Sequence, residues 1–129
     1  MAYPTGSGSE ILSRTAIENA TNAWSSFRWD GTMGTAGTAS YTVPALHIIT
    51  ALNIVFCELG DNASQSISLI HTNQTHDSYI LNVQPLPALG SYVYSEKIVL
   101  IGGDILKVLT SQAAVIDVTC NFIDQNWID

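Results

Sequence analysis

After residue 23 the chain alternates apolar and polar positions with a period of two, which is the pattern of half-buried β-strands. Residues 46–58 carry apolar side chains at both sets of alternate positions, so this strand is expected to be covered on much of both sides. Further short strands are predicted at residues 24–30, 38–43, 66–71, 79–83, 91–94, 97–101 and 104–110. The last strand, at residues 113–123, is predicted to turn a regular set of side chains inward: Ala114, Ile116, Val118, Cys120 and Phe122.

Unbroken alternation within residues 46–58 divides that strand into two faces. One face is expected to hold Leu46, Ile48, Leu52, Ile54 and Phe56, and the other His47, Ile49, Ala51, Asn53, Val55 and Cys57. Farther along, Gly102–Gly103 is expected to join residues 97–101 and 104–110 as paired strands. Seven to nine short strands without an amphipathic helix predict an all-β fold, an antiparallel β-sandwich of jelly-roll or immunoglobulin-like topology.

The first 22 residues differ from the rest and are predicted to form an extended N-terminal arm. Pro4, Gly6 and Gly8 interrupt this segment, with serines between them, and such a composition favours a flexible lead-in. The predicted organisation is therefore an arm at residues 1–22 and one β-sandwich domain at residues 23–129.

Composition and charge exclude several classes of protein. Of the 129 residues 47% are hydrophobic and 12% are charged, which excludes an ordinary disordered tail. The net charge of −7 repels phosphate backbones, so no nucleic-acid partner is expected. No apolar run reaches the ~18 residues of a membrane span, and residues 1–9 lack the pattern of a secretory signal, so no membrane partner is expected either.

No constellation of residues indicates catalysis, and neither a cofactor nor a metal is expected. His71, His76 and Asp77 share one short connection and form the most tempting metal site, but their spacing matches no established motif and a polar hairpin tip accounts for them. Cys57 and Cys120 lie in apolar strands and are expected to be inert core thiols. Because no nucleophile, base and oxyanion donors assemble, the protein is not expected to be an enzyme.

Four short segments carry a resemblance to a known group of proteins. Residues 41–47 (Tyr-Thr-Val-Pro-Ala-Leu-His) lead into the long apolar strand, and residues 63–66 (Ala-Ser-Gln-Ser) form a polar hairpin after it. Residues 98–108 contain the Gly-Gly-Asp turn, and residues 111–118 (Ser-Gln-Ala-Ala-Val-Ile-Asp-Val) follow as the closing strand. Over about residues 40–122 this layout resembles small virion structural proteins of tailed bacteriophages.

This resemblance implies a capsid decoration or cement protein, a β-sandwich that is often a homotrimer. Its partners would be the major capsid protein and other copies of itself, on the outer surface of a virion assembled in the host cytoplasm. A tail, fibre or head-tail component with the same sandwich is the first alternative. The second is a carbohydrate-binding module, in which Trp24, Trp29, Tyr92 and Tyr94 would stack on sugar rings, with Trp29 and Tyr94 exposed together.

The candidate interface residues lie near the two ends of the chain. Arg14 is one of only four basic residues and could pair with a carboxylate, and Trp127 is a plausible interface aromatic. Removal of residues 1–22 is expected to leave the sandwich folded while abolishing capsid binding or trimerisation. The complete set of predicted interface residues is Ile11, Leu12, Arg14, Ile17 and Trp127.

Overall fold

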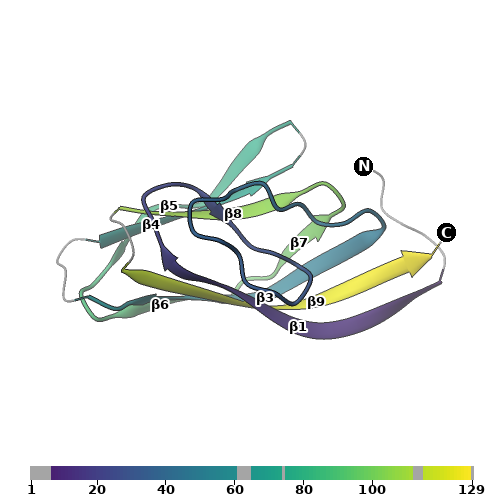
Figure 1. Ribbon diagram of the computed structural model, residues 1–129, viewed down its shortest axis with the longest axis horizontal. Coiled ribbons are helices and arrows are strands. Elements are labelled where there is room, and N and C mark those ends of the chain that lie inside the picture. The colour runs from purple at the N-terminus through teal and green to yellow at the C-terminus, as the bar shows by residue number, and fades with distance from the viewer. Residues whose placement is uncertain (1–6, 61–64, 74, 112–114, 129) are drawn as a thin grey trace.

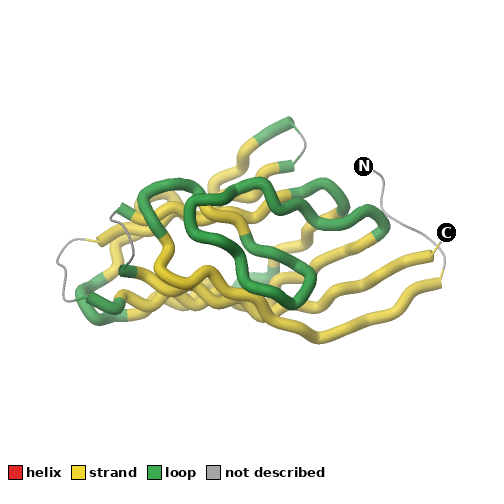
Figure 2. Tube along the Cα trace, viewed as in Figure 1, coloured by secondary structure: helices red, strands yellow, loops and turns green. Residues whose placement is uncertain are grey.

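The computed structural model describes residues 7–60, 65–73, 75–111 and 115–128. Within these ranges the chain consists of strands and loops, and no helix that could cross a membrane is found among them (Figures 1 and 2). The strands of the described residues are β1 (Ser7–Ala20), β2 (Ser25–Ser26), β3 (His47–Glu58), β4 (Gln65–Thr72), β5 (Asp77–Leu86), β6 (Ser91–Tyr94), β7 (Ile98–Ile101), β8 (Ile105–Thr110) and β9 (Ile116–Ile128).

These strands form two antiparallel sheets packed face to face, which confirms the predicted β-sandwich. The five-stranded sheet has the order β1-β9-β3-β6, with β7 pairing on the same edge of β3 as β6. The four-stranded sheet has the order β2-β8-β4-β5. Figure 1 shows β1, β9, β3 and β6 in the lower layer and β4, β5 and β8 in the upper layer.

The core lies between the two sheets, and β9 supplies one wall of it. Four of the five inward positions predicted for this strand are confirmed, because their side chains are 0% exposed, and the fifth, Ala114, lies outside the described residues. Trp29 packs edge-on against Phe122, with ring centroids 5.0 Å apart and planes at 89°. The confirmed positions are Ile116, Val118, Cys120 and Phe122.

The N-terminal segment is a strand of the sandwich rather than a separate arm. Ser7–Ala20 forms β1, which pairs with β9 from Ser7 opposite Ile128 to Ala20 opposite Ile116. Ile17 and Ala20 are 0% exposed and belong to the core. The boundary predicted between residues 22 and 23 therefore does not separate an arm from the sandwich, although residues 1–6 lie outside the described part of the chain. Deleting residues 1–22 would remove part of the core.

A β-bulge changes the predicted faces of the long strand β3. Ala51 pairs with Phe122, and Asn53 pairs with the adjacent β9 residue, Asn121. Leu52 has no partner between them and is the extra residue of the bulge. Ile49 and Ala51 face inward before the bulge, whereas Ile54 and Phe56 face inward after it. Neither of the two predicted faces is therefore correct, because the extra residue shifts the alternation by one position.

The Gly102–Gly103 connection links the two sheets and does not make a hairpin. The strand before it, β7, pairs with β3 in one sheet, and the strand after it, β8, pairs with β2 and β4 in the other. Gly103 has a φ of 93°, which glycine adopts without steric cost. Asp104 fixes the corner, because its Oδ2 accepts hydrogen bonds from the Ile101 N–H and from His71 Nε2, each at 3.0 Å.

Residues 27–46 form a long loop along one side of the sandwich, where two strands were predicted (Figure 2). Only Ser25–Ser26 of residues 24–30 are in a strand, and residues 38–43 contain none. The loop contacts both layers: the Gly34 N–H donates to Ala16 O of β1 at 2.8 Å, and the Phe27 N–H donates to Leu106 O of β8 at 3.1 Å. These isolated bonds replace a continuous ladder.

Replacing Gly34 by alanine should destabilise the sandwich. A Cβ at this position would overlap the Ser26 carbonyl oxygen and press on Ile17 Cγ1 at 3.1 Å, where neither neighbour can move freely in the core. We expect G34A to lower the free energy of unfolding by about 1–3 kcal/mol in urea denaturation. G37A is the control, because no atom lies within 4 Å of its added Cβ; since Gly37 has a φ of 85°, only the strain of that backbone should appear.

The two cysteines should differ sharply in reactivity. Cys120 is buried, and burial raises the pKa of its thiol to about 12, so almost no thiolate exists at pH 8. Cys57 is half-buried on the other face of the same sheet, so the expectation of a core thiol is wrong for this residue. We expect a thiol reagent to modify one cysteine per native chain and both in denaturant, and C57A to leave the native protein unreactive. Rapid modification of native C57A would contradict this.

Candidate interaction surface

Two histidines of the described residues form pairs with aspartates. His47 Nδ1 lies 2.7 Å from Asp124 Oδ1, and His71 Nε2 lies 3.0 Å from Asp104 Oδ2. No group of three or more histidine, cysteine, aspartate or glutamate side chains arranged to hold a metal occurs among the described residues. Each histidine–aspartate pair joins two strands or a strand and a turn, which is a structural role.

The metal site considered at His71, His76 and Asp77 is not assembled. His71 points to Asp104, while His76 is exposed on the connection between β4 and β5. Asp77 accepts a hydrogen bond from the Thr72 hydroxyl at 2.7 Å. The three side chains therefore have separate partners or face solvent.

The aromatic platform required for a carbohydrate-binding module is also absent in the predicted form. Trp29 is 4% exposed and packs in the core against Phe27 and Phe122. Tyr92 packs against Phe56 with ring centroids 6.3 Å apart. Since the sugar-stacking hypothesis needed Trp29 and Tyr94 exposed together, the burial of Trp29 contradicts it.

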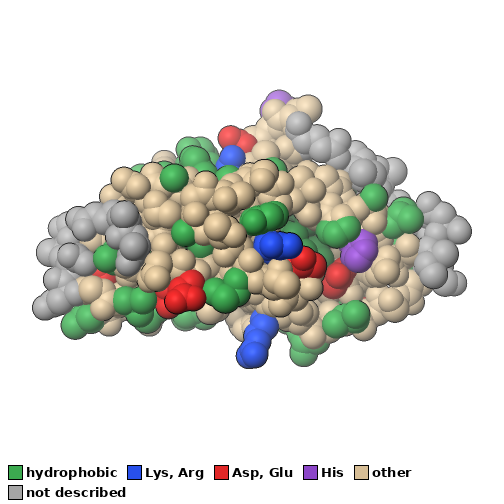
Figure 3. All heavy atoms as spheres, in the orientation of Figure 1, with side chains coloured by type: hydrophobic (Ala, Val, Ile, Leu, Met, Phe, Trp, Pro, Cys, Tyr) green, Lys and Arg blue, Asp and Glu red, His purple; other side chains and the backbone are tan. Residues whose placement is uncertain are grey.

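The first surface feature is the outward side of the five-stranded sheet, here called the outer face. It carries apolar side chains on every strand of the sheet, and the residues contributed by β3, β6 and β7 include no charged one. Leu12, Val93 and Val99 are 73%, 56% and 49% exposed. Figure 3 shows, on one side of the molecule, how few charged side chains the surface has. The apolar members of the outer face are Leu12, Ile48, Leu52, Val55, Val93, Val99, Ile101 and Ile123.

The strand register explains how this outer face is built. Leu12 of β1 lies opposite Ile123 of β9, which lies opposite Thr50 of β3 and then Val99 of β7. This row crosses the whole sheet, and in β3 and β7 the neighbouring residues Ile49, Ala51, Ile98 and Leu100 point into the core. The bulge at Leu52 adds one more apolar side chain to the outer face.

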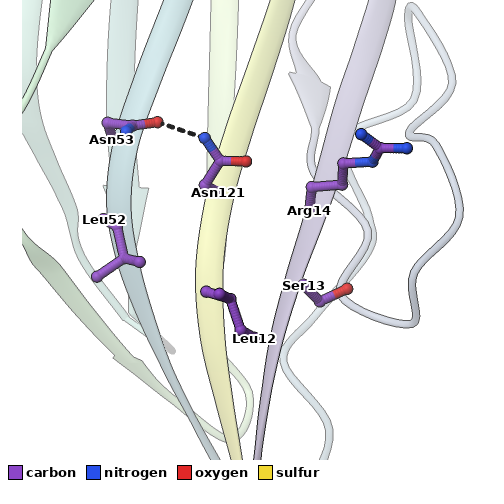
Figure 4. Close-up of a pocket in the computed structure, with 6 residues that line it drawn as sticks. All are labelled: Leu12, Ser13, Arg14, Leu52, Asn53 and Asn121. Atoms are coloured by element: carbon purple, nitrogen blue, oxygen red, sulfur yellow. Dashed lines mark hydrogen bonds between the residues drawn. The ribbon is translucent and has the colours of Figure 1, made fainter.

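A shallow hollow of about 560 Å³ lies on the outer face beside β1 (Figure 4). In Figure 4 the Leu12 side chain lies across β9 on the side of Leu52, while Arg14 points away from β9 and past the sheet edge. The Asn121 side-chain amide donates a hydrogen bond to Asn53 Oδ1 at 2.9 Å. The lining of two leucines, a hydrogen-bonded amide pair, Ser13 and Arg14 suits contact with another protein better than chemistry.

The edge of the five-stranded sheet at β1 is the second feature. At its C-terminal end this edge is covered by the long loop, because Gly34 N–H donates to Ala16 O and the Thr15 hydroxyl donates to Thr32 O at 3.1 Å. Among the described residues no strand lies beside residues 8–14, since β1 is the last strand of its sheet. We call residues 8–14 the open edge.

The predicted interface residues fall into three groups. Ile11 and Leu12 are 60% and 73% exposed, and Arg14 is exposed, so these three lie on or beside the open edge. Ile17 is 0% exposed in the core, so the expectation that it anchors on another molecule is wrong. Trp127 is half-buried and lies over Gly8, where an added Cβ would approach its ring to 3.0 Å.

Comparison with known proteins assigns this chain to no group: no family model matches it, and no curated protein sequence matches it. The functional argument therefore depends on the outer face and the open edge, together with the motifs of the sequence. The outer-face residues on β6 and β7 were missed by the sequence reasoning, although apolar residues on both faces of β3 were the available signal.

Alanine substitutions at Ile17 and Leu12 should affect stability differently, because Ile17 is a core side chain and Leu12 a surface one. We expect I17A to lower the free energy of unfolding by about 2–5 kcal/mol, because it leaves a cavity in the core. L12A should change it by less than about 0.5 kcal/mol, because that side chain is mostly solvated. Urea denaturation at a concentration where the protein is monomeric measures both, and equal losses would contradict the assignment of these side chains.

Proposed function

We propose that the protein is a non-enzymatic virion structural protein of a tailed bacteriophage, a decoration or cement protein that binds and stabilises the assembled capsid. Two observations support this. The motifs at residues 41–47, 98–108 and 111–118 resemble those of such proteins. The folded chain also has an apolar outer face on the side of the five-stranded sheet that its own core does not use.

The outer face is the observation that carries the proposal. Contiguous exposed apolar residues on a soluble protein mark a place where another molecule binds. Each large aliphatic side chain that such a partner buries completely contributes about 1.5–3 kcal/mol. Because β3, β6 and β7 add no charge to this face, a capsid subunit could cover their part of it without burying an unpaired ion.

A decoration protein of this kind needs no active site, because it acts by mass action. Binding only the assembled, expanded shell stabilises that state by RT ln(1 + [L]/Kd), which is about 2.7 kcal/mol per site at 100 times the Kd. Many identical sites on one shell multiply this effect. The major capsid protein is then the partner, and the outer capsid surface is the location.

A tail, fibre or head-tail component remains the second candidate, because the same outer face could serve it. The number of copies per virion distinguishes the two, since a decoration protein is present in hundreds of copies and a tail component in few. The homotrimer implied by the resemblance stays a prediction of the resemblance, and no residue of the outer face specifies a threefold arrangement.

Co-sedimentation with empty, expanded shells of the major capsid protein of the same phage tests the proposal. We expect the wild-type protein to pellet with the shells and V93E to lose most of that binding, because a carboxylate would enter the apolar outer face. The matched control is V83E on β5 of the other sheet, where the valine is 61% exposed against 56% for Val93. No pelleting of the wild type, or equal pelleting of V93E and V83E, would overturn the assignment.

A further inference from the structure

We propose that two copies of this chain associate through β1, the open edge of one pairing antiparallel with the open edge of the other about a twofold axis at Leu12. The pairing joins the two five-stranded sheets into one continuous sheet. It concerns self-association alone, and it holds or fails independently of any role in a virion.

The backbone of the open edge is oriented for this pairing. In an antiparallel strand the N–H and C=O of one residue point to the same side, and the side alternates along the chain. Ala16 directs its carbonyl away from β9, because that oxygen accepts the Gly34 N–H. Two and four residues earlier, Arg14 and Leu12 direct their backbone groups the same way, and Glu10 follows.

The side chains of these same residues are self-complementary. With Leu12 opposite its own copy, Glu10 of each chain lies opposite Arg14 of the other, so the two copies form two pairs of opposite charge flanking an apolar pair. Opposite charges directly across an antiparallel pair are stabilising and like charges destabilising. Centring the pair on Glu10 or Arg14 would instead oppose like charges. The sequence Glu10-Ile11-Leu12-Ser13-Arg14 therefore selects one register.

The long loop sets the length of the paired segment. The Ala16 carbonyl already accepts a hydrogen bond from the Gly34 N–H, and the Thr15 hydroxyl donates to Thr32 O. A second copy can therefore pair only with residues N-terminal to Thr15. In the register centred on Leu12, this leaves residues 10–14 of each chain as the ladder. The two ends of this ladder are identical, because at each end Glu10 of one copy lies opposite Arg14 of the other.

The pairing also covers the apolar side chains that the open edge exposes. Leu12, 73% exposed, would pack against its own copy on the outer face. Ile11, 60% exposed on the opposite face, would lie across from Ser13 and diagonal to the second Ile11, within reach of a long side chain. Both exposed apolar residues of the open edge are thereby accounted for by one partner.

A twofold pairing of identical edges closes after two copies, so it predicts a dimer. Sedimentation equilibrium of the full chain up to about 100 μM should fit a monomer–dimer equilibrium, since micromolar association is populated in this range. E10R and R14E should each weaken the dimer at least about tenfold, because two cross-strand pairs change from attractive to repulsive. The matched controls E96R and K97E alter exposed charges on the β6–β7 connection and should leave the dissociation constant unchanged.

Charge exchange is the decisive arm of the experiment. The double variant E10R/R14E restores opposite charges across the axis and should dimerise like the wild type. An equimolar mixture of E10R and R14E chains should form a mixed dimer, because every cross-strand charge pair is then attractive. Failure of both rescues would overturn the proposal, as would a wild-type chain that is monomeric throughout or forms trimers.

Proline at the axis provides a second, backbone-based measurement. L12P removes an N–H that faces the open edge, where proline is tolerated in an edge strand. We expect L12P to be monomeric at every concentration and to keep the circular dichroism spectrum of the wild type. A dimer that survives L12P would show that the β1 backbone does not form the contact.

Discussion

The structure depends on β9 being paired on both edges, with β1 on one side and β3 on the other. Both edges of this strand are hydrogen-bonded, so its alternation decides which side chains of its neighbours face the core. Inward residues such as Val118 and Phe122 fill the space between the sheets, and outward residues such as Ile123 form the outer face. The core and the candidate interaction surface are thus the inner and outer faces of the same sheet.

The sequence predicts this sandwich well where a strand is regular and poorly where pairing partners are distant. The inward residues of β9 follow strict alternation and were identified correctly. In β3 the bulge at Leu52 has no signature in the apolar pattern, so the predicted faces were wrong. Gly8 and its serine neighbours have the composition of a linker and so predict an arm, whereas the stability of β1 comes from pairing with residues more than 90 positions away.

For the candidate interface residues, too, the sequence predicts exposure correctly where no distant segment covers the strand and wrongly where one does. Ile11, Leu12 and Arg14 were recognised as residues without a reason to be buried, and they are exposed. Ile17 has the same local context but lies where the long loop covers β1 at Gly34 and pairs with the inward residue Val118, so it is buried. The apolar residues on both sides of β3 were interpreted as a strand covered twice. The sequence cannot distinguish a cover within the chain from one supplied by another molecule.

The outer face and the open edge meet at Leu12, which belongs to both. A β-sheet edge with an apolar face and few charges is prone to pair with other edges, and natural proteins usually block it with lysine, proline or a bulge. Residues 10–14 contain none of these devices, but one acidic and one basic residue placed symmetrically about Leu12. Such an arrangement favours one register with one partner instead of open-ended growth. Pairing there would not consume the outer face: it would place two copies side by side in one sheet, with the Leu12 pair at the centre. The resulting surface would be twice as wide, with the uncharged outer-face residues of β3, β6 and β7 of both copies flanking two Glu10–Arg14 pairs, which suits a protein proposed to bind a larger assembly.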